Sequence, residues 1–145
     1  MTLRPATADD APAIAALLRR TLRTSLPFLP ELHTPQEDLA FVAGRVLPEC
    51  AVRVAEAGDG IAGFVAWRDG WIDHLYVDPD RQGQGIGPAL LDAALADGTP
   101  KQLWTFQANA RARRFYEARG FRAVEFTDGE GNEERTPDVR YLWRP

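Results

Sequence analysis

The sequence feature that most restricts the fold is a glycine-rich turn between a strand pattern and a helix pattern. Aromatic and β-branched residues dominate residues 71–77, apolar residues recur at helical spacing over 86–95, and Gly83, Gly85 and Gly87 lie at the junction. Because glycine lacks a Cβ atom, backbone N–H groups of such a turn can approach an anion at the positive end of the next helix. The turn therefore predicts a phosphate or pyrophosphate site, and a tight turn without a ligand is the alternative.

Two common phosphate-binding motifs do not match this turn. The dinucleotide fingerprint has glycine at its first, third and sixth positions, and counting from Gly83 the sixth position is Pro88. The loop of nucleoside triphosphatases requires Gly-Lys-Ser or Gly-Lys-Thr, which the sequence lacks. The spacing therefore argues against both of these nucleotide-binding classes.

The rest of the chain predicts one α/β or α+β domain with helices packed on a sheet. A chain of 145 residues with 45% apolar residues has the size and composition of a single globular domain. Asp-Gly pairs at 59–60 and 69–70 predict an antiparallel meander. Expected strands are residues 52–56, 61–67, 71–77, 102–107, 121–126 and 139–143, and expected helices begin at Thr7, Thr34, Ile86 and Asn109. The helix from Thr34 is expected to end before Pro48.

Two connections are candidates for functional loops. Residues 25–30 are apolar and interrupted by prolines, and we expect them either to form a wall of a binding cleft or to cover the core. Residues 127–138 hold two glycines and several charges, so we expect an exposed loop.

Composition and charge argue against several classes of protein. The net charge of -4 disfavours a general nucleic-acid binder, which needs excess positive charge to neutralise phosphates. The lone Cys50 cannot form an intramolecular disulfide, and no apolar run approaches about 18 residues, so a cytoplasmic location without a membrane partner is expected. His33, His74 and Cys50 are far apart in sequence, so no metal site is expected.

Two motifs resemble the signatures of the Gcn5-related N-acetyltransferase (GNAT) family. Residues 82–87 are similar to its Gln/Arg-x-x-Gly-x-Gly/Ala signature and follow a strand end with Asp78 and Pro79. Residues 109–121 are similar to its second signature, Asn-x-x-Ala-x-x-Phe-Tyr-Glu-x-x-Gly-Phe. The two motifs occur in the family's order, and the other expected elements of residues 2–145 follow it as well.

The resemblance implies the family's fold and an acetyl-CoA site. It implies a mixed, mostly antiparallel sheet of six or seven strands with helices on both faces, in one domain spanning residues 1–145. The residues it implies for the pyrophosphate are Gln82, Gly83, Gln84, Gly85, Ile86 and Gly87, and those for the pantetheine arm are Leu75, Tyr76 and Val77. A strand that parts from its neighbour has free N–H and C=O groups that an extended ligand can satisfy. Pro88 lacks an N–H group, so one phosphate hydrogen bond is expected to be missing.

The resemblance also implies residues for the chemistry. Tyr116 matches the family's tyrosine near the coenzyme sulfur, where its phenol could act as an acid or hydrogen-bond donor, and a core aromatic is the alternative. Asn109 could contact the coenzyme arm and cap its helix. Asp73 and His74 are alternative bases that point to opposite sheet faces unless a bulge intervenes, and an ordered water is a third possibility. Residues 104–106 carry no glutamate, which some family members use there.

The expected activity is direct transfer of an acetyl group from acetyl-CoA to a primary amine of a small molecule or protein. Cys50 lies outside both motifs, so no covalent intermediate is expected. A sensor that binds acyl-CoA without turnover and a nucleotide-binding regulatory domain are the alternatives. Residues that could border the acceptor are Phe28, His33, Trp67, Glu133 and Glu134. The resemblance also makes a homodimer possible.

Overall fold

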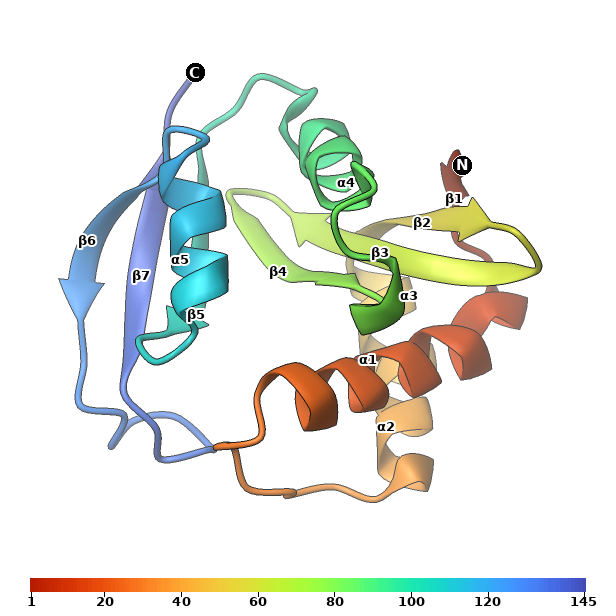
Figure 1. Cartoon of the computed structure of the whole chain (residues 1–145), viewed down its shortest axis with the longest axis horizontal. Helices are drawn as coiled ribbons and strands as arrows, with labels where there is room; N and C mark the ends of the chain where they lie inside the picture. The colour runs from red at the N-terminus through yellow and green to blue at the C-terminus, as the bar shows by residue number, and fades with distance from the viewer.

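The computed structural model describes residues 1–145 as one seven-stranded mixed sheet with helices on both faces (Figure 1). The strands lie in the order β1-β2-β3-β4-β5-β7-β6, which confirms the expected fold class. They are β1 (Thr2–Pro5), β2 (Ala51–Ala57), β3 (Gly60–Arg68), β4 (Trp71–Val77), β5 (Lys101–Phe106), β6 (Arg122–Phe126) and β7 (Asp138–Trp143). The helices are α1 (Ala11–Ser25), α2 (Pro35–Phe41), α3 (Leu47–Glu49), α4 (Ile86–Leu95) and α5 (Ala110–Glu117), with the 3-10 turns η1 (Ala8–Asp10) and η3 (Pro79–Arg81) and the π-helical segment η2 (Val42–Val46).

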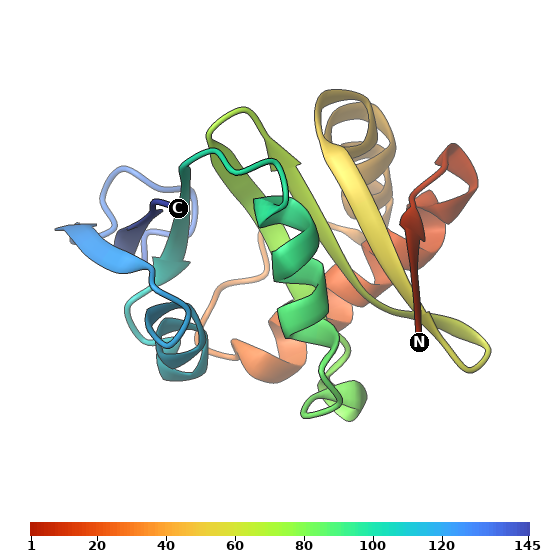
Figure 2. The same ribbon diagram turned by 90° about the horizontal axis from the view of Figure 1, so that it is seen from above.

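The sheet opens at its middle. Strands β1 to β4 pair antiparallel, and so do β5, β7 and β6. In contrast, β4 and β5 are parallel and share one register pair, Trp71 with Gln102. Beyond this pair the two halves of the sheet diverge, as Figure 2 shows from above. The end of β4 therefore has a strand partner on one side only.

Two buried clusters fix the helices on the two faces of the sheet. Alternation along β3 directs Val65 toward the cluster that contains α4 and Tyr116 of α5. It directs Phe64 toward the other cluster, which contains α1 and η2. The open middle of the sheet is therefore flanked by α1 on one face and by α4 and α5 on the other.

Strand β1 is absent from the elements that the sequence predicts. It has four residues, among which Leu3 is the only large apolar side chain, so it has no readable alternation. The strand exists because it pairs with β2, with Leu3 opposite Ala55.

The prediction that the second helix ends before Pro48 is wrong. Its start is as expected, because Thr34 and Glu37 form a capping box. The helix then continues through η2 and α3 to Glu49, and the N–H of Leu47 donates to the carbonyl of Val42, five residues earlier. This wider turn accommodates Pro48, which has no N–H group and whose ring would collide with the carbonyl of a regular helix.

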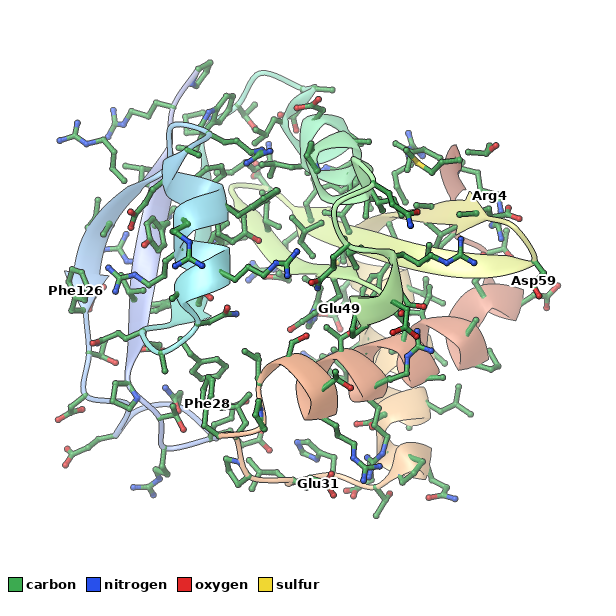
Figure 3. All side chains as sticks on the ribbon, in the orientation of Figure 1. Arg4, Phe28, Glu31, Glu49, Asp59 and Phe126 are labelled. Atoms are coloured by element: carbon green, nitrogen blue, oxygen red, sulfur yellow. The ribbon has the colours of Figure 1, made fainter.

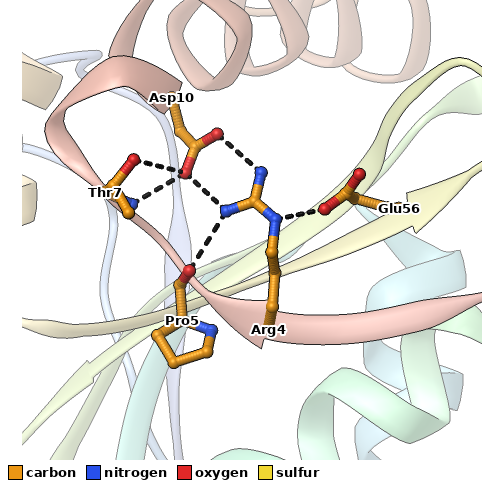
Figure 4. A network of polar contacts seen from close by, with 5 residues as sticks. All are labelled: Arg4, Pro5, Thr7, Asp10 and Glu56. Atoms are coloured by element: carbon orange, nitrogen blue, oxygen red, sulfur yellow. Dashed lines mark hydrogen bonds and ion pairs between the residues drawn. The ribbon is translucent and has the colours of Figure 1, made fainter.

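A polar network anchors β1 to the start of α1 (Figure 4). The Arg4 guanidinium donates to both carboxylate oxygens of Asp10 at 2.8 Å, and its Nε pairs with Glu56 of β2. Asp10 also accepts the Thr7 backbone N–H at 2.7 Å. The hydrogen bond from Arg4 is the main cause that lowers the pKa of Asp10 to about 2, and the hydrogen bond from the Thr7 amide adds to it. Desolvation by burial acts in the opposite direction and raises this pKa.

Replacing Asp10 by asparagine is expected to lower the stability of the fold in a pH-dependent manner. The pKa of Asp10 falls from 3.8 to about 2 on folding, so its contribution is complete above pH 4 and is lost as the pH falls toward 2. Thermal unfolding of wild type and Asp10→Asn should differ most near neutral pH and converge in acid. Asp9→Asn, at the exposed neighbouring carboxylate, serves as the control. A difference that persists unchanged to pH 2 would contradict this assignment.

Candidate active site

A cleft of about 420 Å³ collects residues from both sequence motifs. Its walls are the last turn of α1, the end of β4, the glycine turn with the start of α4, and α5. The predicted coenzyme-binding residues that line it are Leu75, Tyr76, Val77, Gln82, Gly83, Gly85, Ile86, Gly87, Asn109 and Tyr116. Gln84, which is exposed, is the one predicted coenzyme-binding residue that does not line the cleft.

The glycine turn presents unbonded backbone N–H groups. Gly83 and Gly85 both have φ of 81°, which favours glycine, and Gly85 is the N-cap of α4. The first amide of this helix that bonds within the chain is Ala89, to the Gly85 carbonyl, and none of the N–H groups of residues 82–87 donates within the chain. The turn thus places unpaired donors at the positive end of a helix, where an anion is stabilised.

Pro88 follows this turn and lines the cleft without a donor. At Gly87, a Cβ atom would lie 3.4 Å from the Phe115 ring and 3.7 Å from a Val77 methyl group, and both of these residues also line the cleft. The glycine therefore keeps the cleft open between β4 and α5.

The end of β4 forms the second wall. Leu75, Tyr76 and Val77 pair with Val65, Phe64 and Gly63 of β3 on one side, and no strand pairs with them on the other. Their backbone groups on the free side can pair with an extended ligand that carries amides, as in strand addition. A pyrophosphate at the turn and an amide-containing arm along β4 therefore fit this site.

Tyr116 and Asn109 lie on α5. The Asn109 side chain accepts the Ala112 N–H at 3.1 Å, so the predicted helix cap is present. The Tyr116 ring packs edge-on against Phe115 and Phe121, and the residue also lines the cleft. Burial, and then the neighbouring Tyr76 hydroxyl, raise the pKa of Tyr116, so its phenol stays protonated. Tyr116 therefore packs in the core and also lines the cleft.

The arginines of the α5 region divide into two groups. Arg111 and Arg119 line the cleft with Arg81, and the Arg119 guanidinium lies 4.1 Å from the centre of the Phe115 ring. Arg113 instead donates to the Tyr141 hydroxyl at 3.0 Å. Positive charge therefore gathers at the cleft although the chain is acidic overall.

A bulge places Asp73 and His74 on the same side of the sheet. The β3–β4 register passes from Ala66–His74 to Trp67–Ile72, so Asp73 is the extra residue of the bulge. Asp73 accepts from Arg68 at 2.6 Å and lies 3.6 Å from the Cys50 sulfur. Neither Asp73 nor His74 is among the residues that line the cleft.

His74 belongs to an aromatic cluster next to the cleft. Its ring centre lies 5.7 Å from that of Phe41 and 6.0 Å from that of Tyr76, which lines the cleft. Its Nδ1 is buried without a hydrogen-bond partner. Burial lowers the pKa of His74, against an opposing effect of Asp73, so the imidazole is neutral at pH 7.

Two loops that carry predicted acceptor residues meet at the open end of the sheet. His33, before α2, lies 2.7 Å from Glu133 of the β6–β7 loop. Phe28 packs edge-on against Phe106 of β5 at 6.3 Å, and Figure 3 labels it in the space between α1 and β5. Glu134 of the β6–β7 loop is close enough to affect Tyr76. Burial is the main cause that raises the pKa of Tyr76 to about 12, and the negative charge of Glu134 adds to it. Trp67 is elsewhere, because it packs against the core on the α4 side.

Thr21 lines the cleft although it was not among the residues predicted for the site. Its neighbours on this wall, Ser25 and Leu26, belong to the proline-interrupted connection, so that connection both forms a wall and contributes Leu26 to the buried core. Thr21 has no signal in the sequence, because it lies in the middle of a regular helical pattern.

Two further observations concern membrane-spanning helices and metal ligands. None of its helices combines the length and the apolar character needed to cross a membrane. No three side chains among His, Cys, Asp and Glu come together in a group that could hold a metal ion.

The family model of the acetyltransferase (GNAT) domain matches residues 48–123, just over half of the chain. The chain therefore belongs to the Gcn5-related N-acetyltransferase family, as the two motifs predict, and it is an N-acetyltransferase whose acetyl donor is acetyl-CoA. One solved structure of similar fold, yncA from Salmonella typhimurium, contains acetyl-CoA; it is 22% identical, with a TM-score of 0.72 over 98% of this chain and 91% of that one.

Relatives with curated names are acetyltransferases as well. An uncharacterized N-acetyltransferase of Archaeoglobus fulgidus is 35% identical over 57% of this chain and 66% of its own length. Peptidyl-lysine N-acetyltransferase YjaB of Salmonella typhimurium is 28% identical over 86% of this chain and 85% of its own length. The apo structure of YjaB from Escherichia coli has a TM-score of 0.79 with 23% identity, covering 98% of this chain and 96% of that one.

Proposed function

We propose that this N-acetyltransferase transfers the acetyl group directly to a primary amine within a ternary complex, and that lysine side chains are its class of acceptor. The observation that carries the proposal is the cleft that joins the unbonded N–H groups of residues 82–87 to the free edge of β4. These two features match a pyrophosphate and an amide-containing arm on one ligand, and Tyr116 lines the same cleft.

The chain's own groups serve the needs of the transfer. Acetyl-CoA supplies an acyl group that is activated as a thioester. Tyr116 keeps its proton and donates a hydrogen bond to the leaving sulfur, and the unpaired N–H groups of the turn hold the phosphates. The bond between the amine nitrogen and the carbonyl carbon forms as the carbon–sulfur bond breaks. The attacking amine loses one proton, and the leaving thiolate gains one.

We assign the base role to His74, acting directly or through a water molecule. Its imidazole is neutral and its ring packs against Tyr76 at the cleft wall. Asp73 is less suited because its carboxylate is held by Arg68 at 2.6 Å. The bulge turns both residues to the same face of the sheet.

Replacing His74 by glutamine is expected to lower kcat roughly 100-fold, at the low end of general-base effects because water can still accept the proton. Burial lowers the pKa of His74 below 6.5, so wild-type kcat should be constant above that pH and fall only in more acidic solution. The variant should lose this acidic limb. The measurement is kcat against pH at saturating acceptor, with Asp73→Asn as the control that retains the limb. If kcat of His74→Gln depended on pH in the same way as kcat of wild type, His74 would not be the base.

Two observations support a lysine acceptor: the names of the YjaB relatives and the carboxylates of the β6–β7 loop. The YjaB relatives are named peptidyl-lysine N-acetyltransferases. In this chain, Glu133 pairs with His33, Glu134 is close enough to Tyr76 to raise its pKa, and Phe28 packs against Phe106. Carboxylates attract a cationic amine, and aromatic rings can pack on its alkyl stem.

The test combines binding and turnover. Acetyl-CoA and CoA, but not ATP, should raise the unfolding midpoint; a ligand at 100 times its Kd adds about 2.7 kcal/mol. Release of free thiol should then require a peptide with lysine and should be absent with the same peptide carrying arginine. Equal rates with both peptides would reject the lysine acceptor, and binding without turnover on any primary amine would favour the acyl-CoA sensor.

A further inference from the structure

The charged side chains that line the coenzyme cleft are all positive. They are Arg81, Arg111 and Arg119, and the lining includes no aspartate or glutamate. None of the three forms an ion pair with a carboxylate, although the chain has 21 acidic residues against 17 basic ones and arginines elsewhere in the fold are paired. Three arginines without a carboxylate partner therefore line one cleft.

The coenzyme carries more negative charge than the glycine turn neutralises. The N–H groups of residues 82–87 meet a pyrophosphate with hydrogen bonds and with the partial charge of a helix end. The ribose 3′-phosphate of CoA is a phosphate monoester and, like a phosphorylated side chain, has a charge of about −1.5 to −2 at pH 7. Arginine suits such a group because its planar guanidinium binds two phosphate oxygens at once. The 3′-phosphate is therefore the part of the coenzyme that calls for full positive charges.

Two of these arginines lie on one face of α5, on either side of Phe115 in the sequence. Arg111, Phe115 and Arg119 follow one another at intervals of four residues, and all three line the cleft. The Arg119 guanidinium lies 4.1 Å from the centre of the Phe115 ring, and its Nη1 donates to the Phe115 carbonyl at 3.1 Å. The Arg119 side chain therefore points back along the helix, in the direction of Arg111, and is held in place without a carboxylate.

The Phe115 ring connects this arginine face to the glycine turn. A Cβ atom at Gly87 would lie 3.4 Å from the ring, so the last residue of the turn adjoins the ring on which Arg119 lies. The arginine face of α5 is therefore next to the N–H groups proposed for the pyrophosphate.

Arg81 points in another direction. Its guanidinium lies 3.4 Å from the position of a Cβ atom at Gly58, in the turn between β2 and β3. Figure 1 shows this turn and α5 on opposite sides of α4. Arg111 and Arg119 are therefore the charged residues on the α5 side of the pyrophosphate site.

We propose that Arg111 and Arg119 bind the ribose 3′-phosphate of the coenzyme and make the protein selective for CoA over dephospho-CoA, which lacks only this phosphate. The inference rests on the proposed coenzyme orientation, with the pyrophosphate at the glycine turn and the pantetheine arm along β4. The ribose is joined directly to the pyrophosphate, so its 3′-phosphate stays within reach of long side chains that adjoin the turn. Each guanidinium has five N–H donors, and Arg119 uses one of them within the chain.

Substitution of these arginines should weaken the binding of one ligand and spare the other. Arg119→Gln removes the charge and should raise the Kd of CoA about tenfold, as expected for hydrogen bonds to a charged group, while the Kd of dephospho-CoA changes by less than about twofold. Arg111→Gln should act in the same direction, and the double variant should bind the two ligands equally. Arg119→Lys keeps the charge but loses the planar guanidinium, so its Kd for CoA should lie between those of wild type and Arg119→Gln.

Arg114→Gln is the matched control, because Arg114 is exposed on the same helix but does not line the cleft. The experiment measures the Kd of CoA and of dephospho-CoA by calorimetry, at low and at high salt, on wild type and all variants. Wild type and Arg114→Gln should prefer CoA by at least about tenfold at low salt. The preference should shrink at high salt, because Arg111 and Arg119 are exposed and salt screens exposed charges. Unfolding midpoints without ligand should be the same in all of these proteins.

Different failures point to different parts of the argument. Equal affinity of wild type for the two ligands would overturn the inference, and so would a preference for CoA that survives in the double variant. Equal losses for both ligands would assign the arginines to the pyrophosphate and overturn their role in selectivity, as would an equal loss in Arg114→Gln. In all of these cases the proposed coenzyme site would stand. A wild type that binds neither ligand would overturn the proposed function together with this inference.

Discussion

Replacing Tyr116 by phenylalanine is expected to lower kcat about 100-fold while the Kd of CoA changes by less than about twofold. The ring packs against Phe115, Phe121 and Tyr141, and phenylalanine keeps these contacts. The hydroxyl lies at the cleft, and the causes of its raised pKa, burial and the Tyr76 hydroxyl, include no hydrogen-bond partner. The substitution therefore removes the proposed hydrogen-bond donor to the leaving sulfur and little else.

The raised pKa of Tyr116 decides which function it can have. A phenol that is harder to ionise than usual is a poor proton donor to a thiolate, whose conjugate acid has a pKa of about 8.5. Its contribution is therefore a hydrogen bond that strengthens as charge develops on sulfur. Single-turnover rates with preformed acetyl-CoA complex separate this effect from binding. A kcat within about threefold of wild type would show that Tyr116 is only a core aromatic, and unfolding midpoints control for stability.

Replacing Gly87 by leucine should abolish most coenzyme binding, with a Kd at least about 100-fold higher, which corresponds to about 3 kcal/mol. The Cβ atom itself fits, with its nearest neighbours 3.4 Å and 3.7 Å away on Phe115 and Val77. The remaining atoms of the side chain would extend into the cleft that these residues line. Leucine also has a higher helix propensity than glycine, so the fold should lose no stability.

Gly44→Leu is the matched control for this experiment. Gly44 lies in η2, is exposed, and would bring its Cβ within 4 Å of nothing. Both variants make the same change within a helical segment, but only Gly87 faces the cleft. Thermal unfolding without ligand and calorimetry with CoA should show stable proteins in both cases and lost affinity only in Gly87→Leu. A Gly87→Leu protein that binds CoA normally would place the coenzyme elsewhere.

The elements with strong local signals were predicted correctly from the sequence. The Asp-Gly pairs predicted the meander of β2, β3 and β4, but only Asp69-Gly70 forms the expected turn. The turn between β2 and β3 is Gly58–Asp59, one residue earlier than predicted, with φ of 65° at Gly58, and Gly60 pairs with Ala57 within the hairpin. The glycine turn predicted the junction of β4 and α4. Asn109 and Gly120 bracket α5 as expected from capping and left-handed end positions. In each case the residues that specify the conformation are neighbours in the chain.

What the sequence could not predict depends on contacts between distant segments. Strand β1 is specified by β2 and by the Arg4 network rather than by its own residues. The bulge at Asp73 appears only in the register with β3, and it places both candidate bases on one face where strict alternation would separate them. Thr21 has the ordinary pattern of a helix residue, and its place in the cleft wall is visible only once α1 packs beside β4.

The parting of β4 from β5 also affects how this protein behaves in solution when no coenzyme is bound. Beyond Trp71 and Gln102, the sheet has two inner edges in addition to the outer edges at β1 and β6. Unpaired strand edges are templates for pairing with other chains and promote aggregation. A coenzyme bound along the β4 edge, as proposed above, would also protect it, so association between molecules through this edge should compete with acetyl-CoA. The opening proposed to admit the cosubstrate therefore also exposes strand edges that the free protein leaves unpaired.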